Sequence, residues 1–146
     1  MFQISDYIDD TIEYAPGTVQ ALKHFKSKKT FTESTEVRLI AMQILVDEIA
    51  VAYSFPITPT VIARNITGNS SGNSSAELYR VLYGESPRII MEGKLSIITL
   101  LHELAHILLI SSDELLVQRW AINLFRKVYP KQFAKLRFDP RSGLFY

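Results

Sequence analysis

The longest apolar stretch of the chain, residues 95–110, contains three ionisable side chains: His102, Glu103 and His106. Burying two imidazoles and a carboxylate in such a stretch costs free energy unless the groups find partners. The stretch is also shorter than the ~20 apolar residues that cross a bilayer. It therefore predicts a buried helix of a globular protein, with no membrane span, whose three polar residues act together.

These three side chains have the spacing His-Glu-x-x-His. Residues four apart on a helix lie on one face with Cβ atoms about 5–6 Å apart, so His102 and His106 can bind the same ion. Imidazole nitrogens bind zinc at about 2.0–2.1 Å, which suits two adjacent corners of a tetrahedron. Glu103 can face a water held by the metal without binding the metal, as a general base does. The motif predicts a Zn²⁺ site that hydrolyses a peptide bond.

The composition limits the remaining ligands. The chain has 146 residues, three histidines and no cysteine, so disulfide frameworks, thiolate zinc sites and cysteine nucleophiles are excluded. The third histidine, His24, lies far upstream, where we expect a surface helix residue. A catalytic zinc ion typically has three protein ligands. The third ligand must therefore be a carboxylate, and Glu114 and Asp113 are the nearest.

Glu114 has a second interpretation at this point. Ser111 and Glu114 have the spacing of a capping box at the start of the following helix. We prefer Glu114 as the third ligand, with the cap and Asp113 as the alternatives.

The segment LLHELAH, followed by Glu114, Gln118 and Trp120-Ala121, resembles the minimal gluzincin pattern of the ImmA/IrrE-like metallopeptidases. In that family a second helix carries Glu-x-x-Ala-Asn/Asp-x-Phe-Ala. The resemblance implies that Glu114 completes the zinc site and that Gln118 accepts a hydrogen bond from an outer imidazole N–H. It also implies an endopeptidase whose extended protein or peptide substrate pairs with a strand at 87–91, which can equally be an ordinary strand.

Two helices are predicted in the amino-terminal half. The first covers residues 19–28, after the break at Pro16-Gly17. A longer one follows Thr30 and Glu33, which have capping-box spacing, and ends before Pro56. Its predicted core stripe consists of Val37, Ile40, Ala41, Ile44, Leu45, Ile49 and Ala52. Glu48 falls within this spacing, and we interpret it as an edge residue rather than a buried functional carboxylate.

The sequence after that helix predicts a small sheet and then more helices. Strands are predicted at 60–66, 77–82 and 87–91, with a loop of composition GNSSGNSS after the first. Helices are predicted at 95–110 and 114–129, followed by a brief helical turn and a tail. In the last long helix, one face carries Val117, Trp120, Ala121, Leu124, Phe125 and Val128.

The net charge of +1 gives no overall electrostatic attraction to nucleic acid, so we expect no nucleic-acid partner. We interpret the basic segments 23–29 and 126–141 as solvated helix faces. The acidic start of the sequence is unlike a secretory signal, so we expect a cytoplasmic protein.

Together these features predict an α+β fold. We expect one zincin-like domain over residues 1–146, with amino-terminal helices, a mixed or antiparallel sheet of about three strands, and the His-Glu-x-x-His helix followed by a ligand-bearing helix. The alternative function is a catalytically silent protein of the same fold that binds or regulates. Arg88, Arg119 and seven tyrosines are all candidates for stabilising an oxyanion, so no substrate-binding residue is assigned.

Overall fold

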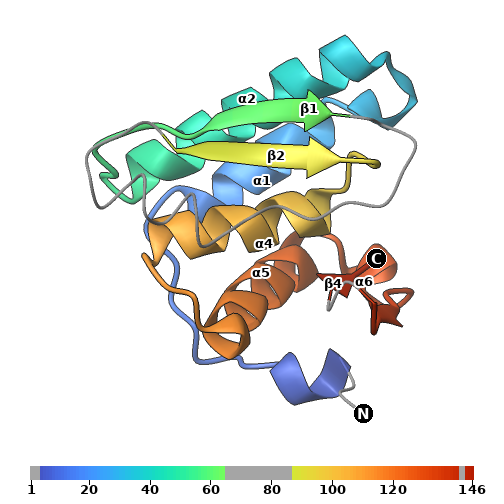
Figure 1. The fold of residues 1–146 in the computed structure, drawn as a ribbon. Helices are drawn as coiled ribbons and strands as arrows, with labels where there is room; N and C mark the ends of the chain where they lie inside the picture. The colour runs from blue at the N-terminus through green and yellow to red at the C-terminus, as the bar shows by residue number, and fades with distance from the viewer. Residues whose placement is uncertain (1–3, 65–86, 142–143) are drawn as a thin grey trace.

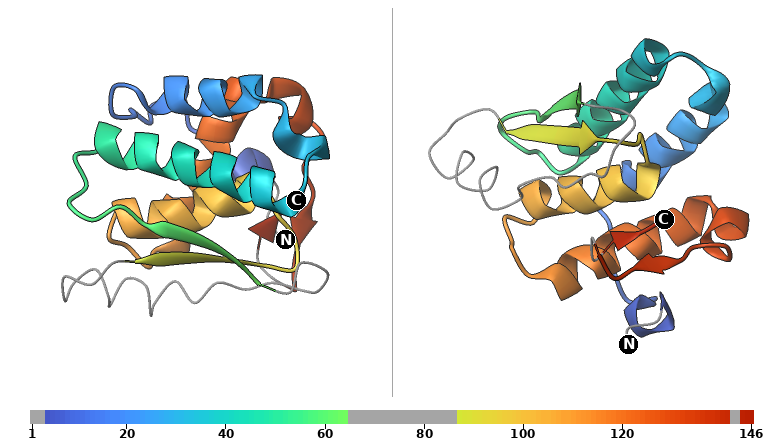
Figure 2. Two further views of the ribbon diagram at one scale, coloured as in Figure 1. Left: turned by 90° about the horizontal axis from the view of Figure 1, so that it is seen from above. Right: turned by 45° about the vertical axis from the view of Figure 1, so that its right-hand side comes forward.

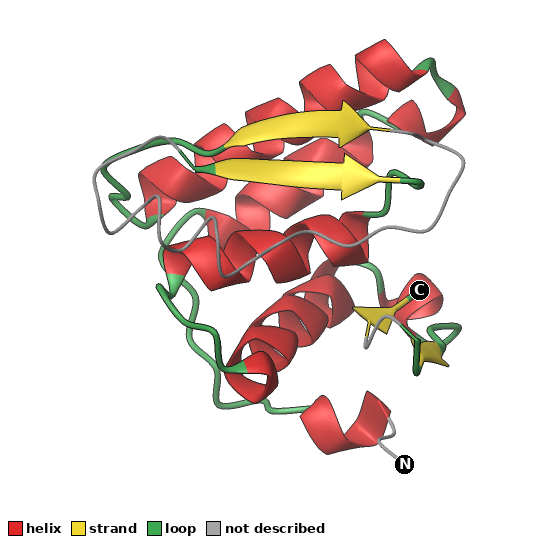
Figure 3. Cartoon of the chain, in the orientation of Figure 1, coloured by secondary structure: helices red, strands yellow, loops and turns green. Residues whose placement is uncertain are grey.

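The computed structural model of the chain describes residues 4–64, 87–141 and 144–146. It is a mixed α/β fold in which helices pack on a two-stranded parallel sheet (Figures 1 and 3). The helices are α1 (Thr18–Ser27), α2 (Thr35–Ala52), α4 (Ile97–Leu108), α5 (Glu114–Val128) and α6 (Pro130–Phe133), with short 3-10 helices η1 (Ile4–Tyr7) and η2 (Thr30–Thr32). The strands are β1 (Thr60–Arg64), β2 (Arg88–Glu92), β3 (Phe138–Asp139) and β4 (Leu144–Phe145).

The elements form three layers. Helices α2 and α4 pack against the sheet, α2 on β1 and α4 on β2, and α1 and α5 lie behind them (Figure 2). One hydrophobic cluster runs through all of these helices and β2. Within the described ranges, none of the helices has the length and apolar character that a membrane span requires.

Helix α2 follows Glu33, as predicted, but it has a different cap from the predicted one. Its cap is Ser34, whose hydroxyl accepts a hydrogen bond from the backbone N–H of Val37 at 3.3 Å. Thr30 instead starts η2, and the N–H of Glu33 donates to the Thr30 carbonyl at 2.9 Å. The predicted capping box of Thr30 and Glu33 is therefore wrong, because a 3-10 turn uses those backbone groups.

The inward face of α2 also differs from the predicted stripe. Ala41, Leu45 and Ile49 are buried as expected, but Val37, Ile40 and Ile44 are exposed. Their places in the core are taken by Met42, Val46 and Ala50. The helix is apolar on most of its circumference, so periodicity alone does not define which side faces the core.

Strands β1 and β2 confirm two of the predicted strands, and their pairing excludes the antiparallel alternative for these two. They pair in parallel, with Thr60 opposite Arg88 and Arg64 opposite Glu92. Parallel neighbours require a long crossover connection, and residues 65–87 provide the length for one. The strand predicted at 77–82 and the predicted loop lie outside the described residues.

Side-chain bonds from α2 fix where β1 starts. Gln43 donates to the Pro59 carbonyl at 2.9 Å and accepts from the N–H of Val61 at 2.8 Å. This amide bridges the helix and the strand.

Helices α4 and α5 confirm the two predicted helices of the carboxy-terminal half. Ser96 caps α4, with its hydroxyl 3.4 Å from the N–H of Thr99. All the apolar residues around the motif histidines are buried, as is the predicted face of α5. The end of the chain, predicted as a tail, instead pairs β3 with β4 and buries Phe145 against the edge of the Tyr7 ring.

Candidate metal centre

The two motif histidines lie on the face of α4 that meets α5. His102 and His106 are 3 % and 2 % exposed, and their Nε2 atoms are 3.3 Å apart. Their separation of four residues brings both rings to one side of the helix. The histidines therefore present two nitrogens to a single point.

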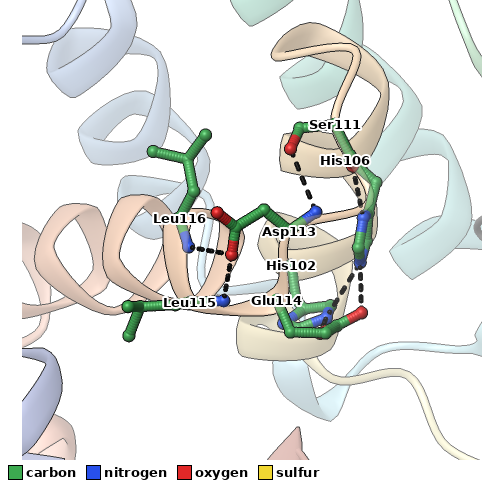
Figure 4. Close-up of polar contacts among 7 residues, drawn as sticks. All are labelled: His102, His106, Ser111, Asp113, Glu114, Leu115 and Leu116. Atoms are coloured by element: carbon green, nitrogen blue, oxygen red, sulfur yellow. Dashed lines mark hydrogen bonds and ion pairs between the residues drawn. The ribbon is translucent and has the colours of Figure 1, made fainter.

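The turn after α4 orients the second of these rings. Ile110 has a left-handed backbone, with φ of 46°, and the N–H of Ser111 donates back to the His106 carbonyl at 3.1 Å. The N–H of Ile110 donates to the Ile107 carbonyl at 3.2 Å. This pair of bonds is a Schellman motif. It brings the Ser111 carbonyl to 2.8 Å from Nδ1 of His106 (Figure 4).

That contact fixes the tautomer of His106. A carbonyl oxygen only accepts hydrogen bonds, so Nδ1 of His106 carries the proton and donates it to Ser111. In the neutral ring, Nε2 then has a free lone pair directed at His102 and Glu114. Metal-binding histidines are held in this way by a partner at the outer nitrogen.

The start of α5 supplies the third group. Asp113 is the cap of α5, and its Oδ1 accepts from the N–H groups of Leu115 at 3.0 Å and Leu116 at 3.4 Å. Glu114 is left free of the cap, and its carboxylate reaches across to α4 (Figure 4). Its Oε2 is 3.0 Å from Nε2 of His102, and its Oε1 is 3.0 Å from Nε2 of His106.

These contacts decide between the alternatives left open by the sequence. The capping box of Ser111 and Glu114 is wrong, because the Ser111 hydroxyl instead accepts from the N–H of Asp113 at 3.0 Å. Asp113 is the cap and does not belong to the cluster, which within the described ranges consists of His102, His106 and Glu114. Ligand atoms of all three lie within 4.8 Å of one another.

The spacing of the three groups fits a tetrahedral ion. Ligands about 2.0–2.1 Å from a central ion occupy corners that are about 3.3–3.4 Å apart. The observed separations of 3.0, 3.0 and 3.3 Å are close to those edges. Two buried imidazoles and one carboxylate are also a donor set that divalent transition metals prefer. The cluster can therefore hold a metal ion.

Electrostatics favours a cation between these groups. With the proton of His106 on Nδ1, its Nε2 lone pair faces the Glu114 carboxylate, and two acceptors at 3.0 Å repel each other. A proton or a metal ion relieves this repulsion. The side-chain hydrogen bond from His102 holds the pKa of Glu114 below its usual range, against partial burial, which raises it. The Glu114 side chain is 64 % exposed, so solvent reaches this side of the cluster.

The structure places the other two predicted site residues nearby. Glu103 follows His102 on α4 and is buried. Gln118 is buried one turn after Glu114 on α5. Nδ1 of His106 pairs with Ser111, and Nδ1 of His102 is buried with no hydrogen-bond partner in the described part of the chain.

Two residues considered from the sequence lie elsewhere. Nδ1 of His24 is 3.0 Å from Oε1 of Glu48, and both side chains are partly exposed. Glu48 is thus at the edge of α2, as predicted, and His24 is a surface helix residue, as predicted. This pair is separate from the cluster.

Ser111 is the site residue that the sequence pattern did not indicate. Its contribution comes from a backbone carbonyl, which no side-chain motif records. Only its position could have indicated it, because Ile110 and Ser111 come immediately after α4. At a helix end, a left-handed turn returns the chain toward the last helical residues.

Comparison with known proteins assigns neither a family nor a function to this cluster. No protein-family model, curated protein or solved structure matches the chain.

Proposed function

We propose that the protein is a zinc-dependent endopeptidase that cleaves a protein or peptide substrate. One observation carries the proposal: Nε2 of His102, Nε2 of His106 and the Glu114 carboxylate converge, with the tautomer of His106 fixed by Ser111. The same helix carries Glu103 in the position that a general base occupies in the His-Glu-x-x-His motif.

In this proposal His102, His106 and Glu114 hold Zn²⁺. A zinc ion bound by three protein groups lowers the pKa of water to about 7 and polarises a carbonyl oxygen. Glu103 takes a proton from the attacking water and later delivers it to the leaving amine. Ser111 keeps the lone pair of His106 directed at the ion, since a ring rotation would break the hydrogen bond at Nδ1.

The substrate backbone is proposed to lie along β2. This strand packs beside α4, the helix that carries the two histidines of the cluster. Main-chain pairing with Arg88–Glu92 would hold an extended peptide with little selection among its side chains.

Elemental analysis beside a peptidase assay tests the proposal. The wild type, purified with zinc present, should hold one Zn²⁺ per chain and cleave unstructured protein substrates. Glu103→Gln should hold the same zinc and lose cleavage by a factor of about 100 or more, since general bases contribute roughly 10²–10⁴-fold. A wild type that binds no zinc would refute the proposal.

The same experiment addresses the alternative of a silent protein. A silent protein would hold zinc through the same three residues while wild type and Glu103→Gln remained equally inactive on a broad panel of unfolded proteins and peptides. That outcome would retain the metal site and remove the peptidase activity.

A further inference from the structure

The start of α4 lines a cavity of about 760 Å³, at the opposite end of this helix from the turn that carries Ser111. Segments of α1, α2, α5 and the chain end complete its wall. None of its lining residues belongs to the His102, His106 and Glu114 cluster. Its volume falls within the roughly 300–1,000 Å³ of small-molecule sites.

The lining is mainly apolar and aromatic. Phe25 from α1, Met42 from α2 and Phe125 from α5 are buried residues that reach this cavity from three helices. Phe31 in η2 also lines it, although its side chain is 76 % exposed. An exposed phenylalanine beside an apolar cavity offers surface that a hydrocarbon chain can cover.

The charged side chains in the lining are all positive. Lys26, Lys29 and Arg38 line the cavity, and no aspartate or glutamate among the described residues does. Lys26 donates to the Val128 carbonyl at 2.8 Å, and Arg38 donates to the Leu95 carbonyl at 3.0 Å. No carboxylate pairs with any of these three cations in the described part of the chain. The cavity therefore combines an apolar interior with cationic side chains that no carboxylate side chain of the described residues neutralises.

We propose that this cavity binds a single-chain amphiphilic carboxylate of the fatty-acid type. The alkyl chain contacts the apolar lining, and the carboxylate is neutralised by Lys29 and Arg38. A cationic amphiphile would be repelled, and a short carboxylate would bury too little surface. This site is separate from the proposed peptidase function and does not depend on it.

Calorimetric titration of the full chain with decanoate, below its micelle concentration, tests the proposal. Decanoate should bind one per chain, and octanoate about tenfold more weakly, because each buried methylene changes affinity by up to about fourfold. Decyltrimethylammonium should not bind in the same range. Equal binding of the cationic amphiphile, or no binding of decanoate, would overturn the proposal.

Two substitutions with matched controls locate the site. Lys29→Asn removes a cation at a position with φ of 52°, which asparagine tolerates, and should weaken decanoate binding about two- to fivefold. Its control is Lys23→Asn on α1, outside the lining. Phe31→Ala should weaken binding about threefold or more, whereas Val51→Ala, equally exposed on α2, should not. Unchanged binding in both cavity variants would place the ligand elsewhere.

Two further measurements distinguish this cavity from a lipid-binding surface and from the metal centre. Co-sedimentation with phosphatidylglycerol vesicles distinguishes a free ligand from a lipid surface, and vesicle binding without decanoate binding would refute the proposal. Both cavity variants should keep the zinc content of the wild type. Loss of zinc together with decanoate binding would show that the cavity is not an independent site.

Discussion

Asp113 and Glu114 are adjacent in the chain, yet the carboxylate of Asp113 caps α5 while that of Glu114 contacts both motif histidines. The two side chains leave the first turn of α5 in different directions (Figure 4). Two chemically similar neighbours can therefore be removed separately, with different consequences.

Asp113→Ala should destabilise the fold without removing the metal. Loss of the cap leaves the N–H groups of Leu115 and Leu116 unpaired, which should lower the free energy of unfolding by about 1 kcal/mol. Denaturant unfolding measures this change, and zinc stoichiometry should stay at the wild-type value. Loss of zinc at unchanged stability would show that Asp113 is a ligand.

Glu114→Ala should have the opposite effect. Because Glu114 contacts both Nε2 atoms, its removal should weaken zinc binding by more than about 100-fold, beyond the effect typical of residues outside the ligand shell. Competition with a zinc chelator measures the affinity. The exposed side chain adds little to the metal-free fold, so unfolding in chelator should be nearly unchanged. Retained tight binding would exclude Glu114 from the site.

Zinc should stabilise the folded chain. A ligand that binds only the native state adds RT ln(1 + [L]/Kd), or about 2.7 kcal/mol at 100 times Kd. Thermal unfolding with saturating zinc should therefore occur several degrees higher than after dialysis against chelator. His102→Ala provides the control, since this variant should unfold at the same temperature with and without zinc.

Ile110→Gly should raise stability. A β-branched residue in the left-handed region costs about 1–2 kcal/mol that glycine avoids, and the Ile110 side chain is 48 % exposed. Glycine also loses more conformational entropy on folding than isoleucine does, which offsets part of this stabilisation. We expect a net rise of about 1 kcal/mol in the free energy of unfolding. Ile110→Val, which keeps the branched side chain, should show no rise.

Asn123 should be one of the polar residues on which the fold most depends. Its buried amide donates to the carbonyls of Tyr7 at 2.9 Å and Arg119 at 2.7 Å, and accepts from the N–H of Asp9 at 3.0 Å. Asn123→Ala removes all three side-chain hydrogen bonds at a buried position and should lower the free energy of unfolding by about 2–3 kcal/mol.

A second contact between the same segments provides its control. Arg126 pairs with Asp10 at 2.6 Å on the surface, where ion pairs contribute about 0–1 kcal/mol. Arg126→Ala should therefore have a much smaller effect. If both variants lost the same free energy of unfolding, the prediction that the fold depends more on Asn123 than on Arg126 would be wrong.

The sequence predicted the residues that meet at the site better than it predicted their surroundings. His102 and His106 follow from their spacing along one helix, which is local information, and Glu114 is preferred among the nearest carboxylates by composition and family resemblance. The partner of His106 is a carbonyl of Ser111, so no side-chain pattern could indicate it. The expected partner Gln118 lies on α5, and whether it reaches a ring depends on how α5 packs against α4.

The errors in the fold have a similar cause. Ser34 rather than Thr30 caps α2, because several hydroxyl and acidic residues compete in one short segment. The exposed positions Ile40 and Ile44 look like core residues in a helix that is apolar on most sides. Whether β1 and β2 pair in parallel depends on the path of the chain between them, which strand propensity does not encode.

All three groups of the cluster lie between residues 102 and 114. The free energy needed to close a loop, which comes from lost chain entropy, is about 2 kcal/mol smaller for 13 residues than for about 100 residues. The helical hairpin of α4 and α5 therefore behaves as a single short chelating peptide. A metal held there would depend on a local turn rather than on the sheet, so substitutions in β1 or β2 should leave its affinity nearly unchanged.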